Sequence, residues 1–318
     1  MARSVGRLYS AVFPGCEPAP DLRPPRVAHT TKDAIRLRWL GTAGFIVESA
    51  TTTLLIDPYL TRAPLSTLVA SPLVPDESAI RAHLPARVDA VLCGHSHFDH
   101  LLDAPLIAAL RGAKLVGSET TSAFGRAQGL SADQIVTVGG RGATLSIGDF
   151  EVRFVASLHA RILFGRVPFP GTVSSTPRLP ARAWAYRMGG AFGIIVRHRG
   201  VSIYHNGSAD LVDAQLAGEH AQILLAGIAG RQTTNGYLSR LTGLLRPKVV
   251  IPAHHDAFFA PLEAGLRLLP GIDLHGFVAE TKRVAPNATI VLPLYEETLA
   301  FGPSGGNVGV VAEQHVAP

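Results

Sequence analysis

The feature that most constrains this chain is the segment G-H-S-H-F-D-H at residues 94–100, which directly follows the apolar run A-V-L-C. A short run that is apolar throughout is typical of a strand covered on both faces. Three histidines and one aspartate therefore stand together at the end of a buried strand. Histidine rarely fills a solvated surface turn in such density, so the segment predicts a binding site at the edge of a sheet.

The spacing of these residues indicates metal binding. In an extended segment, side chains at positions i and i+2 point the same way, so His95 and His97 can bind one ion. Asp99 and His100 fall at the expected start of a helix and turn toward a neighbouring position that could hold a second ion. Imidazole and carboxylate groups suit Zn²⁺, Fe²⁺ or Mn²⁺, and the lack of thiolates favours a catalytic site over a closed structural one.

The rest of the chain predicts one α/β domain. Strand and helix patterns alternate over residues 34–302 without a change in composition, which suits two sheets packed face to face with helices outside. Residues 1–33 form a proline-rich N-terminal arm, and residues 303–318 form a C-terminal tail. Residues 161–183 contain four prolines and two phenylalanines without periodicity, which indicates a lid-like loop.

Composition narrows the class of protein. Apolar residues make up 47% of the chain and charged residues 17%, so a large core can be buried. The net charge of +5 is spread without a run of Lys and Arg, so nucleic acid is not expected as a partner. No apolar stretch is long enough for a transmembrane helix, and the amino terminus lacks the apolar core of a secretory signal. With only two cysteines, a reducing cytoplasm is the expected location.

G-H-S-H-F-D-H resembles the signature of the metallo-β-lactamase fold superfamily, and the resemblance extends from about residue 35 to residue 301. The segments L-G-T-A-G-F-I-V-E and L-L-I-D-P-Y are similar to the branch that contains L-ascorbate-6-phosphate lactonase-like and N-acylphosphatidylethanolamine phospholipase D-like proteins. This resemblance implies a four-layer αββα sandwich with two mixed sheets. It also implies a metal-dependent hydrolase that cleaves an ester, lactone or phosphodiester bond in a small or lipid-like substrate.

The resemblance also implies a set of ligands for two divalent ions. Zinc is the expected metal, with manganese or iron as alternatives. Asp57 would support the metal loop by hydrogen bonding. His255 points away from its neighbour in extended geometry and is assigned no ligand role. The implied ligands are His95, His97 and His159 for the first ion, and Asp99, His100 and His254 for the second.

The bridging carboxylate departs from the family pattern. The family usually ends a strand with Gly-Asp, whereas here Gly207 is followed by Ser208. Either Asp210 reaches in through a longer turn, or Ser208 takes the place and the second ion is weakly bound or missing. We expect Asp210 to bridge, and we expect Asp99 or Asp210 to orient the attacking water.

Residues for substrate binding are suggested by A-G-R-Q-T-T-N-G-Y, which follows a buried strand at the same expected sheet edge. Arg231 could bind a phosphate or carboxylate, and Asn235 or Tyr237 could donate to a carbonyl. In and beside the lid-like loop, Phe164, Phe169 and Trp184 could cover an apolar group. A competing interpretation is a catalytically silent metal-binding scaffold that lost its bridging carboxylate at Ser208. The sequence does not indicate the oligomeric state.

Overall fold

The first sheet is mixed, because its strands from β15 to β3 pair antiparallel and those from β3 to β6 pair parallel. The computed structural model describes residues 13–24, 34–304 and 307–313, with side chains described as far as residue 302. The strands lie in the order β15 (Asn307–Glu313), β14 (Thr298–Ser304), β1 (Ile35–Gly41), β2 (Gly44–Glu48), β3 (Thr53–Ile56), β4 (Ala90–Leu92), β5 (Lys114–Gly117) and β6 (Ile135–Thr137).

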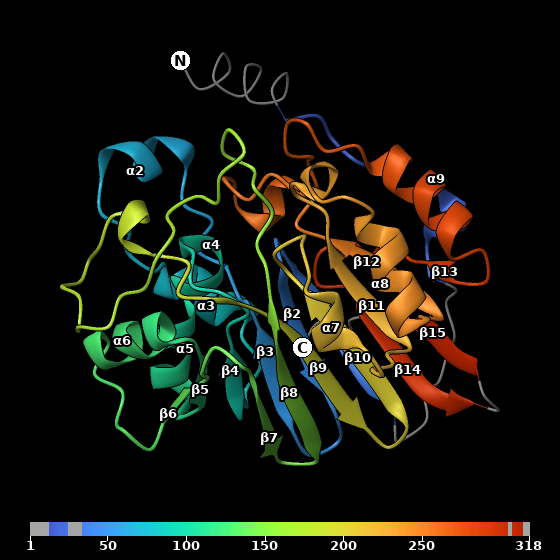
Figure 1. Cartoon of the computed structure of the whole chain (residues 1–318). Helices are drawn as coiled ribbons and strands as arrows, with labels where there is room; N and C mark the ends of the chain where they lie inside the picture. Colours follow the sequence, from blue (N-terminus) through green and yellow to red (C-terminus); the bar gives the residue numbers. More distant parts are fainter. Residues whose placement is uncertain (1–12, 25–33, 305–306, 314–318) are drawn as a thin grey trace.

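The second sheet is also mixed and faces the first (Figure 1). Its strands from β7 to β10 pair antiparallel, and those from β10 to β13 pair parallel. The strands lie in the order β13 (Thr289–Ile290), β12 (Val249–Ala253), β11 (Ile223–Gly227), β10 (Val201–Asn206), β9 (Ala191–His198), β8 (Phe150–Ser157) and β7 (Ala143–Ile147).

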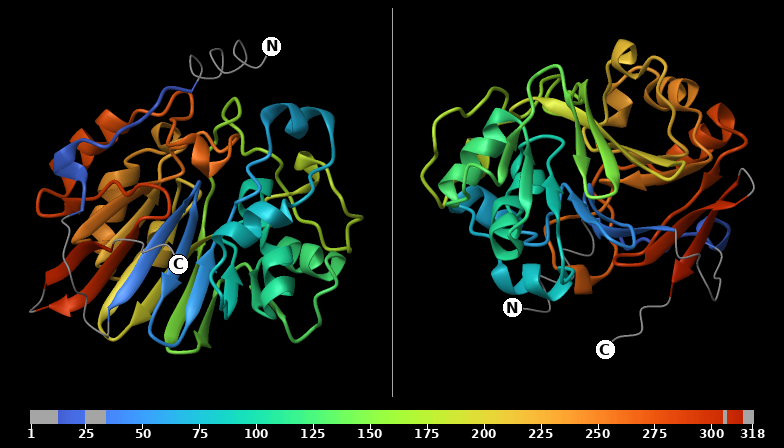
Figure 2. Two further views of the ribbon diagram at one scale, coloured as in Figure 1. Left: turned by 180° about the vertical axis from the view of Figure 1, so that it is seen from behind. Right: turned by 90° about the horizontal axis from the view of Figure 1, so that it is seen from below.

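Helices cover the two outer faces, as the view along the sheets makes clear (Figure 2). Ile107 and Phe124 pack on the first sheet, whereas Leu238, Leu241 and Phe277 pack on the second. The described helices are α2 (Leu65–Ala70), α3 (Glu77–His83), α4 (Phe98–Leu101), α5 (Ala104–Arg111), α6 (Glu119–Ala127), α7 (Asp213–Leu216), α8 (Tyr237–Leu245) and α9 (Leu274–Val284).

The central core lies between the sheets because alternate side chains of each strand point inward. Trp39, Phe45, Phe154, Phe192 and Ile251 are all buried there. Two faced sheets with outer helices confirm the predicted αββα sandwich. The ends of β4, β8, β10 and β12 approach one edge of this sandwich, which lies toward the top of Figure 1.

The chain ends add detail to the predicted organisation. Residues 13–24 of the arm lie along the domain, where Leu22 joins the outer core of the second sheet and the Cys16 N–H donates to the Leu266 carbonyl at 3.0 Å. The predicted tail contributes β15, which pairs with β14. The parts of the arm and tail at 1–12, 25–33 and 314–318 lie outside the described residues. In the part of the chain that is described, no helix is long and apolar enough to cross a membrane.

Candidate metal centre and active site

The loop after β4 concentrates four polar side chains in a buried position. The His97 backbone caps the short helix α4, so the chain turns sharply between His97 and Asp99. His95, His97, Asp99 and His100 are each at most 8% exposed. Burial of so many polar groups is costly unless they bind one another or a ligand.

A three-histidine cluster forms where this loop meets the end of β8. His95, His97 and His159 have ring centroids between 4.7 and 4.9 Å apart, and each presents a ring nitrogen within 4.8 Å of the others. The Nδ1 atom of His159 lies 2.7 Å from the Ala160 carbonyl oxygen, so it donates there and leaves Nε2 to face the cluster.

A carboxylate cluster lies beside it and is formed by Asp99, His100 and His254, whose potential ligand atoms also lie within 4.8 Å of one another. The Nε2 atom of His254, which follows β12, is 3.2 Å from the Asp99 carboxylate. The His95 and His100 rings are only 3.8 Å apart, so the two clusters are immediate neighbours.

Asp57 lies beneath both clusters at the end of β3. Its Oδ1 accepts the Gly94 N–H at 2.6 Å, and its Oδ2 is 2.9 Å from Nδ1 of His100. Asp57 also forms a group with His95 and His100 in which the potential ligand atoms lie within 4.8 Å of one another. Because both of its oxygens already face partners in the loop, we interpret Asp57 as the supporting group predicted from the sequence.

The protonation states of His95, His97 and Asp99 suit a cation, whereas His100 would have to lose its proton to bind one. Burial lowers the pKa of His97 to about 4, and burial followed by the proximity of His100 lowers the pKa of His95 well below its usual range. Burial opposes ionisation of Asp99, but His100 and His254 together hold the pKa of that carboxyl below its usual value. Burial also opposes the charging of His100, yet Asp57 and Asp99 outweigh it and raise its pKa.

The donor set therefore fits one or two divalent ions. Neutral imidazoles and an ionised carboxylate are the forms that bind metals. Nε2 of His100 is buried and makes no hydrogen bond within the described residues, which is costly unless a cation satisfies it. Nitrogen and carboxylate ligands without thiolates match zinc, manganese or iron and do not select among them.

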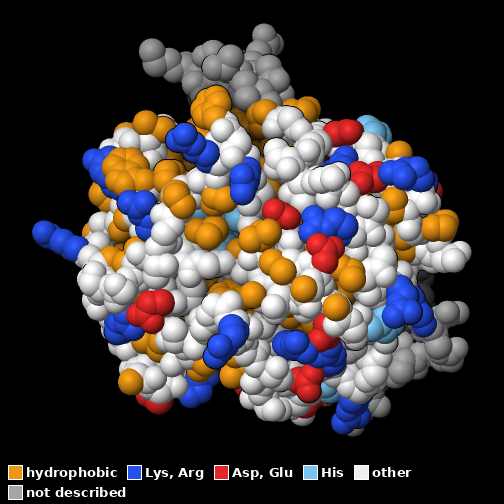
Figure 3. Space-filling view, viewed as in Figure 1, with side chains coloured by type: hydrophobic (Ala, Val, Ile, Leu, Met, Phe, Trp, Pro, Cys, Tyr) orange, Lys and Arg blue, Asp and Glu red, His pale blue; other side chains and the backbone are white. Residues whose placement is uncertain are grey.

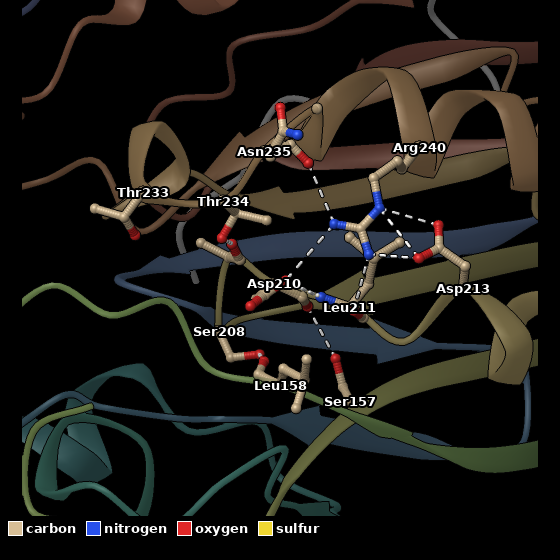
Figure 4. A network of polar contacts seen from close by, with 12 residues as sticks. Ser157, Leu158, Ser208, Asp210, Leu211, Asp213, Thr233, Thr234, Asn235 and Arg240 are labelled. Atoms are coloured by element: carbon tan, nitrogen blue, oxygen red, sulfur yellow. Dashed lines mark hydrogen bonds and ion pairs between the residues drawn. The ribbon is translucent and has the colours of Figure 1, made fainter. Parts of the chain in front are cut away.

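The structure does not bring Asp210 to these clusters, which corrects the expectation that it bridges them. Asn206 accepts the N–H groups of Ser208 and Ala209, and Ala209 has a φ of 54°, so the chain turns before Asp210. The Asp210 carboxylate instead accepts the Leu211 N–H and lies 3.9 Å from the Arg240 guanidinium (Figure 4).

Ser208 takes the place beside the clusters. It lines the cavity described below, and its hydroxyl donates to the Leu158 carbonyl at 2.8 Å (Figure 4). The Ser208 carbonyl accepts the N–H of Ala160, so this turn and the His159 turn are held together. Of the two alternatives that the sequence left open, the geometry favours a serine at this position and no bridging carboxylate.

The three predicted substrate-binding residues lie away from the clusters. Arg231 is 8% exposed and pairs with Glu280 of α9 at 2.5 Å. Tyr237 is buried at the start of α8, and Asn235 is exposed, with its carbonyl accepting from Arg240 (Figure 4). None of the three lines the cavity. The side chains of Arg231 and Tyr237 instead pack against the helical layer, through Glu280 and the outer core of the second sheet.

A cavity of about 240 Å³ opens above the clusters. Figure 3 shows histidine surface set among hydrophobic side chains near the middle of this face. No Lys or Arg from the described part of the chain lines the cavity. The cavity wall is formed by Phe98, Ile162, Pro168, Phe169, Ala229, Phe258 and Leu269.

Among the predicted apolar candidates, only Phe169 lines this cavity. Phe164 is 97% exposed at the tip of a turn, and Trp184 stacks with Arg182. Phe98 and Phe258 were not predicted to line the site. Phe98 lies inside the motif at 94–100 and Phe258 stands three positions after His255, and that proximity to histidine is the signal that could have identified them.

Comparison with known proteins agrees with this geometry. Residues 36–254 match the model of the β-lactamase superfamily domain. The chain is 30% identical over 229 residues to a UPF0173 metal-dependent hydrolase of Anaeromyxobacter sp. (strain K), covering 69% of this chain and 74% of that one. It is 31% identical to a UPF0173 metal-dependent hydrolase of Archaeoglobus fulgidus, covering 70% and 84%.

A solved structure supports the fold. Igni18, a metallo hydrolase from Ignicoccus hospitalis, is 19% identical and superposes with a TM-score of 0.54 over 85% of this chain and all of its own. The family match covers more than half of the chain and includes the residues from β1 to His254. The chain therefore belongs to the β-lactamase superfamily and is a metal-dependent hydrolase of the metallo-β-lactamase fold.

Proposed function

We propose that this hydrolase binds divalent cations at the three-histidine and carboxylate clusters and cleaves a neutral ester or lactone that carries an apolar group. The observation that carries the proposal is the position of both clusters at the base of a cavity whose wall is apolar. Zinc is the metal we expect first, with manganese or iron as alternatives.

A bound divalent cation supplies Lewis acidity and lowers the pKa of water from about 15.7 to about 7. The chain's own residues hold and orient the reactants. Asp99 is ionised and 3.2 Å from Nε2 of His254, so it can accept a hydrogen bond from the attacking water and pass its proton to the leaving oxygen. Asp57 keeps His100 in place through the contact at Nδ1.

The cavity lining supports a neutral substrate over a phosphodiester. Sites that bind phosphate through metal ions commonly add Arg or Lys, and neither residue type lines the cavity within the described residues. Phe98, Phe169 and Phe258 instead offer aromatic surface to an acyl chain or ring. The volume of about 240 Å³ suits a small substrate or one end of an amphiphile.

The proposal is tested by turnover of a panel that contains p-nitrophenyl acetate, p-nitrophenyl hexanoate, several lactones and bis-p-nitrophenyl phosphate. We expect the zinc-loaded protein to prefer the hexanoate ester or a lactone to the phosphodiester. His97→Ala should lower kcat/KM by at least about 100-fold. His275→Ala removes an exposed histidine of α9 and should not change it. Equal rates for wild type and His97→Ala on every substrate would sink the proposal.

The apolar wall can be tested separately. Phe258 contacts His254 edge-on with ring centroids 5.3 Å apart, and it lines the cavity. Phe258→Leu keeps an apolar residue but removes aromatic contact. It should lower kcat/KM for the hexanoate ester by several-fold to about tenfold and spare the acetate ester, because a few methylene contacts carry effects of this size. Equal losses on both esters would show that the wall does not select the acyl group.

The alternative is a catalytically silent metal-binding scaffold, and Ser208 is the observation that favours it. Without a bridging carboxylate, Asp99 is the one carboxylate within the two clusters, and Asp57 lies beside His95 and His100. This alternative predicts stoichiometric metal binding without turnover of any substrate in the panel. The two interpretations therefore separate in the same experiment.

A further inference from the structure

The lid-like loop at 161–183 makes a direct hydrogen bond to one of the clustered histidines. The Nε2 atom of His97 lies 2.9 Å from the carbonyl oxygen of Pro168. A carbonyl can only accept, so the proton of this bond must be on Nε2. A neutral imidazole carries one proton, which leaves the lone pair of His97 on Nδ1.

This arrangement limits how His97 can bind a cation. A ring nitrogen that donates a hydrogen bond to a carbonyl has no lone pair to offer a metal. The ring can therefore serve the three-histidine cluster only through Nδ1. His159 makes the opposite choice, because its Nδ1 bonds to the Ala160 carbonyl and its Nε2 remains for the cluster. The two histidines thus depend on different backbone carbonyls for their orientation.

Main-chain bonds fix the segment that carries Pro168. The Met188 N–H donates to the Phe169 carbonyl at 3.0 Å, and the Ser96 N–H donates to the Met188 carbonyl at 3.0 Å. A continuous ladder therefore connects the lid-like loop to the residue between His95 and His97. Gly189 extends the ladder by donating to Gly171 at 2.8 Å.

Phe169 indicates that the surrounding structure holds this conformation firmly. Its φ is 39°, in the left-handed region that a bulky side chain rarely adopts. Such a conformation persists only where neighbouring contacts impose it. Its ring meets the His97 ring edge-on with centroids 6.2 Å apart, and it also lines the cavity.

We infer that the Pro168 carbonyl is a positioning group for His97, which holds the ring as the Nε2–H tautomer with Nδ1 turned to the cluster. The segment around Pro168 and Phe169 is then a fixed part of the metal centre and does not move as a lid. The inference rests on the proposed function in one respect, namely that His97 binds the cation.

The sharpest test weakens this one carbonyl and leaves every side chain in place. Replacement of Phe169 by phenyllactic acid converts the Pro168–Phe169 amide to an ester, whose carbonyl is a weaker acceptor. The N–H lost in this change donates to no group within the described residues. The matched control replaces Leu179 with leucic acid. That ester lies in the same loop, and neither the Arg178 carbonyl nor the Leu179 N–H has a hydrogen-bond partner in the described structure.

Two measurements read out the variants without relying on activity. The first is ¹⁵N NMR of histidine-labelled, metal-free protein, with the His97 signals assigned by comparison with His97→Gln. The wild type should show His97 as the Nε2–H tautomer, and the Phe169 ester should show a mixture. The second is the dissociation constant for Zn²⁺ from competition with a chelating dye. This constant should rise by about tenfold in the Phe169 ester, which is the lower end of the 10- to 100-fold range known for loss of a supporting group. It should rise by less than about twofold in the Leu179 ester.

An Nδ1–H tautomer in the wild type overturns the inference and needs no variant to detect. Unchanged zinc affinity in the Phe169 ester, with its fold verified by circular dichroism, also overturns it. These outcomes are distinct from failure of the proposed function. A wild type that binds zinc, shows the ester effect and hydrolyses nothing would support the positioning role and refute the hydrolase.

Discussion

The loop after β4 and the loop after β10 each carry an aspartate to the same edge of the sandwich but place it differently. In the first, α4 begins at Phe98 and brings Asp99 into the buried cluster with His100. In the second, Asn206 holds the backbone at Ser208 and Ala209, and the Asp210 carboxylate turns toward Arg240. The position of a carboxylate at a strand end thus depends on how the turn is hydrogen-bonded, in addition to its distance along the chain.

The two loops are also expected to contribute differently to metal binding. The first supplies four of the six clustered side chains, and the second supplies a neutral hydroxyl that bonds to Leu158. We therefore expect metal binding to depend strongly on the first loop and weakly on Asp210. Matched substitutions in the two loops test this difference.

The largest effect is expected from Asp99→Asn. This change removes the one carboxylate of the carboxylate cluster and preserves its shape. Metal affinity at that cluster should fall by at least about 100-fold, since loss of a ligand exceeds the 10- to 100-fold effects known for supporting residues. Isothermal titration with zinc, before and after mild chelation, measures the change. A loss below about threefold would contradict the importance assigned to the first loop.

A gain should follow from Ser208→Asp. An added carboxylate beside the clusters would offset the charge of two neighbouring cations, and we expect at least about tenfold tighter binding of the second ion. Ser208→Asn is the control of similar size without charge. Elemental analysis after dialysis against limiting zinc compares the variants. Equal metal content in both would mean that charge at this position does not limit occupancy.

The smallest effect is expected from Asp210→Asn. Its carboxylate is partly exposed and 3.9 Å from Arg240, so its removal should cost about 0.5 kcal/mol of unfolding free energy. Zinc affinity and kcat/KM should change by less than about twofold, measured as for Asp99→Asn. A 100-fold loss in this variant would restore the bridging role that the sequence suggested.

Much of the fold was predictable because its signals are local. Apolar runs such as A-V-L-C and alternating runs such as I-R-L-R-W mark strands, and both sheets of the predicted sandwich are present. The clustered histidines were identifiable because each follows a strand whose end reaches the same edge. The roles assigned to them remain predictions that metal binding must test.

The remaining errors come from contacts between distant parts of the chain and from one unusual backbone turn. The direction of Arg231 depends on Glu280, 49 positions later, and no local pattern announces that pair. The turn at Ala209 depends on a positive φ in a residue other than glycine. The link from Pro168 to His97 crosses 71 positions and involves a backbone carbonyl, which has no sequence signature.

The most direct measurement is the number of metal equivalents per chain by elemental mass spectrometry, for wild type, His95→Ala and the exposed control His275→Ala. We expect at least one equivalent in the wild type and in His275→Ala, and a clear loss in His95→Ala, because His95 lies in the three-histidine cluster and its ring centroid is 3.8 Å from that of His100. No metal in the wild type after reloading with zinc, manganese or iron would show that these clusters do not bind a cation. Equal content in all three proteins would show the same, because the bound metal would then lie elsewhere.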